Sequence, residues 1–208
     1  MRIKNGNFRS QILQIRQIFE HNNLYNHLNL REQKILKLMS KTYETERLII
    51  KLVDIDDAEF LMHLLNTEKW LKNIGDRNVH NLQDAQKYVR EKNLPNIERL
   101  GYGNCVVILK SSNTKIGTVG LYDREGIDGV DIGFAYMEEY EGKGYAYEAA
   151  RKIMDIGIND FGIRKVSAIT LPENLSSIKL IEKLGLKFKE VIRIPNDDAD
   201  LNLYELNL

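Results

Sequence analysis

The segment with the clearest chemical potential is a glycine-rich junction between a strand and a helix. An apolar run of strand type at residues 130–137 leads through a short acidic turn into Gly-Lys-Gly-Tyr-Ala at residues 142–146, and a strong helix former follows at 148–158. The first backbone N–H groups of such a helix have no partner within it, and the helix dipole adds partial positive charge there. The junction therefore suits a phosphate or pyrophosphate group. A glycine-rich turn that only reverses the chain is the alternative.

Three known phosphate-loop patterns can be compared with this junction. A nucleotide P-loop requires Ser or Thr after its Gly-Lys pair, but Lys143 is followed by Gly144. A dinucleotide fingerprint requires a third small residue where Tyr147 stands. The pattern Gln/Arg-x-x-Gly-x-Gly/Ala fits Glu141-x-x-Gly144-x-Ala146 at every place except the first. In this third pattern the chain resembles the GNAT superfamily of N-acetyltransferases, whose members hold the pyrophosphate of acetyl-CoA on such a loop.

Motifs on both sides of the loop extend the resemblance over roughly residues 43–208. Residues 172–186 resemble the family's second signature, in which Asn opens a helix that ends in Glu-Lys-Leu-Gly. Residues 45–50 look like the family's first strand, and residues 56–58 look like the start of its first helix. Residues 65–85 are similar to the branch that includes the ribosomal-protein N-terminal (alanine/serine) acetyltransferases.

The resemblance implies a single α/β (α+β) domain whose central sheet is mixed, mostly antiparallel and splayed, with helices on its flanks. The residue patterns agree, because strands and helices follow one another in mixed order. Apolar alternation and turn residues predict strands at residues 47–53, 104–110, 115–122, 128–137, 165–171, 186–192 and 201–207. Helical patterns predict helices at residues 56–66 with Asp56 as N-cap, 82–99 with an interruption near Pro95, 144–160 and 176–184.

The first 38 residues differ from the rest of the chain. They are rich in Asn, carry seven Lys or Arg against two acids, and repeat apolar residues at a helical period. We expect residues 1–38 to form a basic helical extension and residues 39–208 to form the GNAT-like domain. Met39 looks like a natural start, so a misassigned upstream initiation codon is the alternative origin of the extension.

The family's acetyl-CoA site can be carried over residue by residue. The resemblance implies that the pantetheine arm runs beside residues 135–137 in the gap where two strands splay. Asn174 would contact this arm, although a simple N-cap is an alternative role. Glu141 replaces the family's Gln or Arg, and we expect it to point to solvent, since an anion beside phosphate is unfavourable. The expected cofactor-binding residues are Ala135, Tyr136, Met137, Gly142, Lys143, Gly144, Tyr145, Ala146, Asn174 and Ser177.

Acetyl transfer to an amine needs a neutral amine, a stabilised oxyanion and a proton for the leaving thiolate. Asp131 stands where relatives of this branch often carry an acid, so we expect it to take the amine's proton. An exposed carboxylate at a strand edge is the alternative for Asp131. We expect a backbone N–H near Met137 to face the thioester oxygen. Many relatives carry a tyrosine as general acid where this chain has Ile181, so water or another tyrosine would have to protonate the thiolate.

The residues after the first predicted helix resemble the family's acceptor-side loop. Trp70, Leu71 and Ile74 are the expected acceptor-binding residues there, although Trp70 could belong to the core instead. Glu138 follows the central strand and could bind the positive charge of the acceptor.

Composition excludes several classes of protein. The chain has 208 residues, 43% hydrophobic and 29% charged, which is ordinary for a globular protein. No apolar run reaches the ~20 residues of a membrane span, and no signal-peptide pattern opens the chain. The single cysteine, Cys105, lies in an apolar run and is expected to be a buried thiol, not a nucleophile. The four histidines show no ligand spacing. We therefore expect a cytoplasmic protein without a metal or a membrane partner.

The charge distribution also bears on the partner. Residues 39–208 hold 23 bases against 28 acids, and this acidic balance argues against nucleic acid. It is compatible with a cationic amine or a basic peptide end.

Two functional hypotheses follow. In the first, the chain is an acetyl-CoA-dependent N-acetyltransferase whose acceptor, a protein N-terminus or a small-molecule amine, attacks directly. In the second, it is a catalytically silent domain that binds acyl-CoA as a sensor or partner. The glycine loop fits both, and Ile181 slightly favours the second. We expect a monomer or a homodimer.

Overall fold

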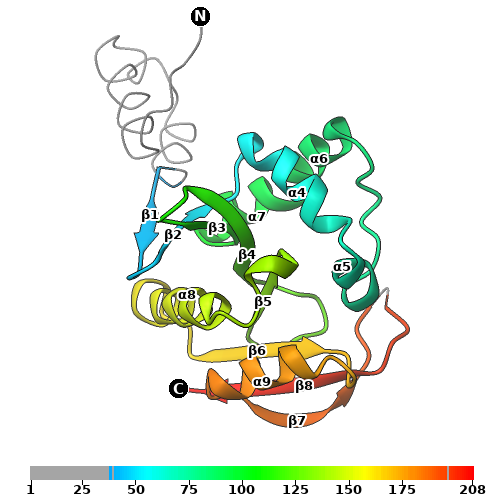
Figure 1. Ribbon diagram of the computed structural model, residues 1–208. Helices are drawn as coiled ribbons and strands as arrows, with labels where there is room; N and C mark the ends of the chain where they lie inside the picture. Colours follow the sequence, from blue (N-terminus) through cyan, green and yellow to red (C-terminus); the bar gives the residue numbers. More distant parts are fainter. Residues whose placement is uncertain (1–37, 39, 196) are drawn as a thin grey trace, which may run out of the picture.

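The computed structural model describes residue 38, residues 40–195 and residues 197–208, so the predicted extension lies almost wholly outside the described residues. The described residues form one eight-stranded sheet in the order β1-β2-β3-β4-β5-β6-β8-β7 (Figure 1). The strands are β1 (Thr42–Glu44), β2 (Leu48–Leu52), β3 (Asn104–Leu109), β4 (Thr114–Tyr122), β5 (Val130–Tyr136), β6 (Lys165–Thr170), β7 (Lys187–Ile192) and β8 (Leu201–Asn207).

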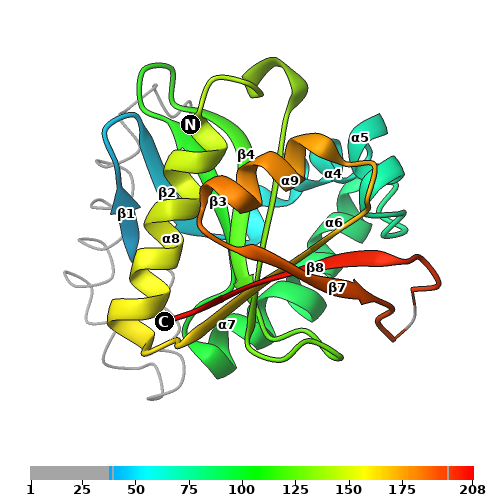
Figure 2. The ribbon, with the colours of Figure 1, turned by 90° about the horizontal axis from the view of Figure 1, so that it is seen from below.

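Helices cover both faces of this sheet, as Figures 1 and 2 show. The helices are α4 (Ala58–Leu65), α5 (Glu68–Asn73), α6 (Leu82–Tyr88), α7 (Leu94–Leu100), α8 (Tyr145–Phe161) and α9 (Leu175–Lys183). Helices α8 and α9 lie on one face and α4 and α6 on the other, while α7 contributes Ile97 to the core beneath α8 and Leu94 to the core beneath α4 and α6. In the described part of the chain, no helix has both the length and the apolarity to cross a membrane.

The side chains of strand β3 pack against helices on both faces of the sheet. Cys105 and Val107 pack into the hydrophobic core beneath α8, whereas Val106 and Ile108 pack into the core beneath α4 and α6. Side chains alternate between the two faces of a strand, and both faces here are covered by helices. This is why the run at 105–109 is apolar throughout, and why Cys105 is buried as predicted.

Two helix boundaries depend on local backbone chemistry. The predicted interruption near Pro95 is confirmed, because a turn of π-helix at Val89–Asn93 separates α6 from α7. The predicted N-cap at Asp56 is wrong. The chain leaves β2 earlier and first forms a short 3-10 helix, Ile55–Asp57, whose N-cap is Asp54. The Asp54 carboxylate accepts from the Asp56 N–H at 2.9 Å, and the Asp57 carboxylate accepts from the Asp54 N–H at 2.9 Å.

The sheet is antiparallel except between β5 and β6, which confirms the prediction of a mixed, mostly antiparallel and splayed sheet. These two parallel strands pair only at Val130 with Val166 and at Asp131 with Ser167. Beyond Asp131 they separate, while β5 stays paired with β4 as far as Tyr136. The sheet therefore opens along the C-terminal half of β5.

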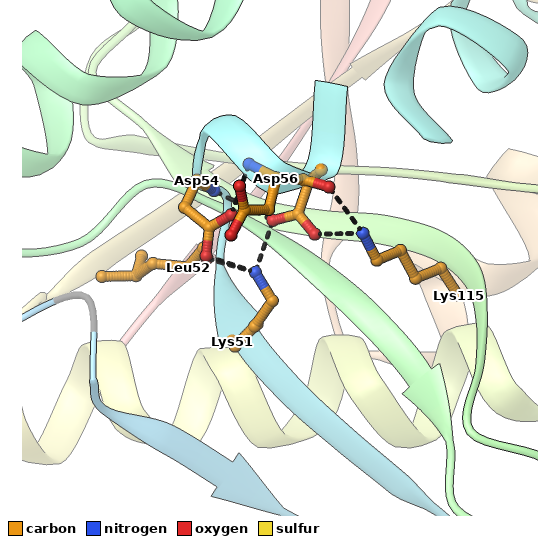
Figure 3. Close-up of polar contacts among 6 residues, drawn as sticks. Lys51, Leu52, Asp54, Asp56 and Lys115 are labelled. Carbon is orange, nitrogen blue, oxygen red and sulfur yellow. Dashed lines mark hydrogen bonds and ion pairs between the residues drawn. The ribbon is translucent and has the colours of Figure 1, made fainter. Parts of the chain in front are cut away.

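A buried ion network fastens α4 to the sheet (Figure 3). The Lys51 ammonium group lies 2.8 Å from the Asp54 carboxylate and also binds that of Asp57, while Lys115 lies 2.7 Å from Asp57. Asp57 is fully buried and Lys51 is 3% exposed. Burial lowers the pKa of Lys51, but Asp57 and Asp54 raise it above its ordinary value. Burial also opposes the charge of Asp57, but Lys51 and Lys115 hold the pKa of that carboxyl below its usual value.

We expect Asp57→Asn to lower the free energy of unfolding by about 3 kcal/mol, because it leaves the buried Lys51 with one carboxylate fewer. Urea denaturation followed by circular dichroism measures this change. The control is Asp155→Asn, which breaks the exposed pair between Asp155 and Arg151 and should change the free energy by less than about 1 kcal/mol. Equally small changes in both variants would show that the network does not hold α4 in place.

Candidate active site

A cleft of about 720 Å³ opens at the place where β5 and β6 separate. One side is lined by β5, the first turn of α8 and α9, and the other by residues from α5 to α7. The cleft thus joins the predicted phosphate loop to the predicted acceptor side. A ligand in it would reach the open edge of β5.

The predicted phosphate loop is the start of α8. Gly144 is the N-cap of this 17-residue helix and has a φ of +82°, a conformation that favours glycine. No side chain caps the helix, so the N–H groups of its first turn are available to a ligand. Gly142, Gly144, Tyr145 and Ala146 all line the cleft. Lys143 does not line it, and its ammonium group lies 5.6 Å from the centre of the Tyr140 ring.

An arginine from the turn before β2 braces this loop, which the sequence did not reveal. Arg47 Nε lies 2.7 Å from Glu148 Oε2, and Arg47 Nη1 donates to the Lys143 carbonyl at 3.0 Å. The guanidinium group also lies 4.5 Å from the centre of the Tyr145 ring. Burial raises the pKa of Glu148, but hydrogen bonds from Thr45 and Arg47 hold it below its usual value. The only acid in the first turn of α8 is therefore neutralised from outside the helix.

Glu141 is exposed, as predicted, but its charge is paired. Its carboxylate binds the ammonium group of Lys69, which projects from α5. Glu138 lies 3.5 Å from the same ammonium group, but its side chain is 82% exposed and it does not line the cleft. The unfavourable anion beside the phosphate loop is thus offset by Lys69 from the opposite wall, and not by Lys143.

Asp131 lies at the point where β5 and β6 part. It is 1% exposed, so the alternative of an exposed edge carboxylate is wrong. Its Oδ2 atom lies 2.6 Å from Arg124 Nε. Burial raises the pKa of Asp131, and the Arg124 guanidinium and the Ile169 backbone N–H only partly oppose this rise. A buried carboxylate in this cleft, with a raised pKa, has the properties of a general base.

The backbone amide of Met137 is not free. It donates to the Ile116 carbonyl at 3.0 Å, on the side of β4. Successive N–H groups of a strand point in opposite directions, so the N–H of Tyr136 is the one that faces the opening. Tyr136 lines the cleft, whereas Met137 does not. The backbone N–H group expected near Met137 to bind the oxyanion is therefore that of Tyr136.

The hydroxyl group of Tyr136 is also distinctive. It is buried and has no hydrogen-bond partner among the described residues. Burial raises the pKa of this tyrosine, so the hydroxyl remains protonated at neutral pH.

Asn174 and Ser177 line the cleft from the start of α9. Asn174 is an N-cap, because its Oδ1 accepts from the Ser177 N–H at 3.2 Å and from the Ser176 hydroxyl at 3.0 Å. Its amide NH₂ makes no hydrogen bond with any described residue and could contact a ligand. Ile181, at the position where many relatives carry a tyrosine, also lines the cleft and is 1% exposed.

The acceptor side is built on α5, a helix that the sequence analysis treated as a loop. The Thr67 hydroxyl caps it by accepting from the Trp70 N–H. Trp70 donates from Nε1 to the Gly75 carbonyl at 3.1 Å and lines the cleft together with Ile74, while also packing against the core. Leu71 is 42% exposed and does not line the cleft.

The sequence patterns assign no role to several other lining residues. They are Arg77, Tyr88, Lys92, Asn104, Tyr122 and Arg124. Tyr122 lies across β5, where a Cβ at Gly133 would be 3.1 Å from its ring, and its hydroxyl donates to Asn104 Oδ1 at 2.8 Å. The two small residues beside the Tyr122 side chain, Gly120 and Gly133, were the available signal for this arrangement, because a Cβ at Gly120 would lie 2.7 Å from the Tyr122 hydroxyl.

Comparisons with known proteins agree with this architecture. The profile of the acetyltransferase (GNAT) domain matches residues 47–187. The uncharacterized N-acetyltransferase YnaD of Bacillus subtilis (strain 168) is 27% identical over 166 residues, covering 78% of this chain and 94% of YnaD.

Two solved structures have the same fold. The ribosomal-protein-S5-alanine acetyltransferase of Vibrio fischeri superposes with a TM-score of 0.68 at 19% identity, covering 80% of this chain and 96% of that one. The ribosomal-protein acetyltransferase RimL, solved in complex with coenzyme A, superposes with a TM-score of 0.69 at 17% identity, covering 81% and 98%.

We expect Cys105 to resist alkylation by iodoacetamide at pH 8 in the folded protein, because burial raises its pKa to about 12 and leaves almost no thiolate. Mass spectrometry of intact protein measures the modification. The same protein in urea should react fully, which controls for reagent quality. Rapid labelling of the folded protein would show that the thiol is accessible.

Proposed function

Because the chain belongs to the GNAT family of acetyltransferases, we propose that it transfers the acetyl group of acetyl-CoA to a primary amine, on a protein N-terminus or a small molecule, by direct attack. The observation that carries this proposal is one continuous cleft that includes the uncapped first turn of α8, the open edge of β5 and the buried Asp131. A donor and an acceptor can meet in it.

The residues present fit acetyl-CoA. The N–H groups at the start of α8 would hold the pyrophosphate, and Lys69 offsets the charge of Glu141 beside them. The pantetheine arm would lie along the β5 edge, next to Ala135 and Tyr136, with the Asn174 amide within the same cleft. When bound, acetyl-CoA supplies the thioester that is cleaved. The coenzyme A complex of RimL, which shares the fold, supports this assignment.

The chain's own residues then account for two parts of the reaction. Asp131 accepts a proton from the attacking amine, directly or through water, and Arg124 fixes the orientation of its carboxylate. The Tyr136 N–H donates to the oxygen on which charge develops. As the new C–N bond forms and the C–S bond breaks, the thiolate takes a proton from water or from a tyrosine, since Ile181 has no proton to give. Cys105 is buried and takes no part.

Replacement of Gly144 by alanine should weaken acetyl-CoA binding about tenfold or more, which corresponds to about 1.4 kcal/mol. A side chain at a φ of +82° strains the loop, and the new Cβ atom would lie 3.3 Å from Nη2 of Arg47, the arginine that braces this loop. Isothermal titration calorimetry measures the affinity.

The matched control is Gly162→Ala at the other end of the same helix. Gly162 has a φ of +67° and open space around it, so this variant carries similar strain away from the cleft. It should lose stability and keep its affinity for acetyl-CoA. Equal affinities in both variants would remove the start of α8 from the cofactor site.

Asp131→Asn should lower kcat by ~10²–10⁴-fold and leave the acetyl-CoA affinity nearly unchanged, because an amide cannot accept the amine's proton. Burial raises the pKa of Asp131, so the wild-type kcat/KM should fall as the pH drops through a value above that of an ordinary aspartate, about 3.9. Free thiol release at varied pH measures both effects.

This assignment has a clear structural competitor. If Asp131 only shapes the point where β5 and β6 part, Asp131→Asn would weaken acetyl-CoA binding in parallel with kcat. Full activity of the variant on a good acceptor would equally rule out Asp131 as the base.

A further inference from the structure

Each carboxylate that lines the cleft is paired with a cation, whereas some of the cations that line it have no carboxylate partner among the described residues. Its three acids, Asp123, Asp131 and Glu141, are each paired with a cation. Arg99 Nη2 lies 2.8 Å from Asp123, Arg124 Nε lies 2.6 Å from Asp131, and Lys69 binds Glu141. No unpaired carboxylate of the described residues therefore remains in the cleft to bind a cationic acceptor.

Two cations on the acceptor side have no such partner. Arg77, in the segment between α5 and α6, and Lys92, in the π-helical turn after α6, both line the cleft. Neither makes an ion pair or a side-chain hydrogen bond with any described residue. Their charges are therefore free to bind a ligand.

Tyr88 lines the same cleft, and its hydroxyl makes no hydrogen bond with any described residue. Burial raises the pKa of Tyr88, and the positive charges of Arg77 and Arg124 oppose this rise. The acceptor side thus gathers a guanidinium group, an ammonium group and a hydroxyl group, all of them hydrogen-bond donors.

Building on the proposed function, we propose that the acceptor amine also carries a carboxylate, which binds at Arg77, Tyr88 and Lys92 while its amino group reaches Asp131. An arginine fork matches the geometry of a carboxylate, and such charge-assisted bonds are among the strongest that side chains make. Residues 39–208 carry more acids than bases, but these excess acids lie outside the cleft, and so does Glu138. The acceptor class is therefore anionic and not cationic.

The carboxylate could belong to a free amino acid or to an acidic residue near a peptide N-terminus. The test uses matched pairs for both sources: amino acids against their amides, and N-terminal peptides with Asp against the same peptides with Asn. We expect kcat/KM for the acid to exceed that for its neutral partner by about tenfold or more in at least one source. The ammonium group of an amino acid amide loses its proton more readily than that of the free amino acid. The amide is therefore more often present as the reactive neutral amine, and this difference works against the expected preference for the acid.

Arg77→Gln and Lys92→Gln should each abolish most of the preference by raising KM for the acids about tenfold, with little change for the neutral partners. Arg90→Gln is the matched control, because Arg90 is an exposed cation in the same π-helical turn but does not line the cleft. It should keep the wild-type preference. The acetyl-CoA affinity of all three variants should equal that of the wild type.

Equal kcat/KM for acids and neutral partners, or faster acetylation of polyamines, would overturn the anionic subsite and leave N-acetyl transfer standing. A preference that survives both Arg77→Gln and Lys92→Gln would also overturn it. Failure to acetylate any amine in the panel, despite tight acetyl-CoA binding, would overturn the proposed function and the subsite with it.

Discussion

Parallel strands β5 and β6 share only two residue pairs before they separate, although β5 remains paired with β4 from Asp131 to Tyr136. An opened sheet leaves backbone N–H and C=O groups without partners, and such groups are costly unless something else binds them. At the point of separation, the buried Asp131 carboxylate interacts with the Ile169 N–H of β6 and is itself held by Arg124. Further along, the open edge of β5 faces the cleft. The proposed cofactor site, the proposed base Asp131 and the proposed oxyanion-binding amide of Tyr136 all depend on this separation.

The elements around the opening are fixed from outside the cleft. Arg47 binds both Glu148 and the Lys143 carbonyl, so the start of α8 is braced without any side chain capping its N–H groups. On the other face, the buried network of Lys51, Asp57 and Lys115 holds the start of α4 against β2 and β4. Both groups lie apart from the reacting atoms. Arg47 therefore fixes the start of α8, and the buried network fixes the start of α4.

The two walls differ in their chemistry. The wall formed by α8 and α9 offers backbone N–H groups and small residues. These suit the proposed donor, acetyl-CoA, a long molecule with phosphate groups that many acetyltransferases use. The wall formed by α5, α6 and the π-helical turn offers individual side chains, including Arg77 and Lys92. The extra residue of the π-helical turn changes the direction of the side chains between α6 and α7. Specificity for the acceptor is therefore expected to depend on this second wall.

The sequence alone determined most of the strands and helices, the two-sided burial of β3, the splayed sheet implied by family resemblance, and the glycine junction at residues 142–146. These features depend on periodicity and on backbone conformation, which neighbouring residues control. The tertiary structure alone decided that Asp131 is buried against Arg124, that Glu141 pairs with Lys69, and that Met137 donates to Ile116. It also decided which cations of the second wall lack partners. Such pairings join segments that are far apart in the chain, and no local pattern records the direction in which their side chains meet.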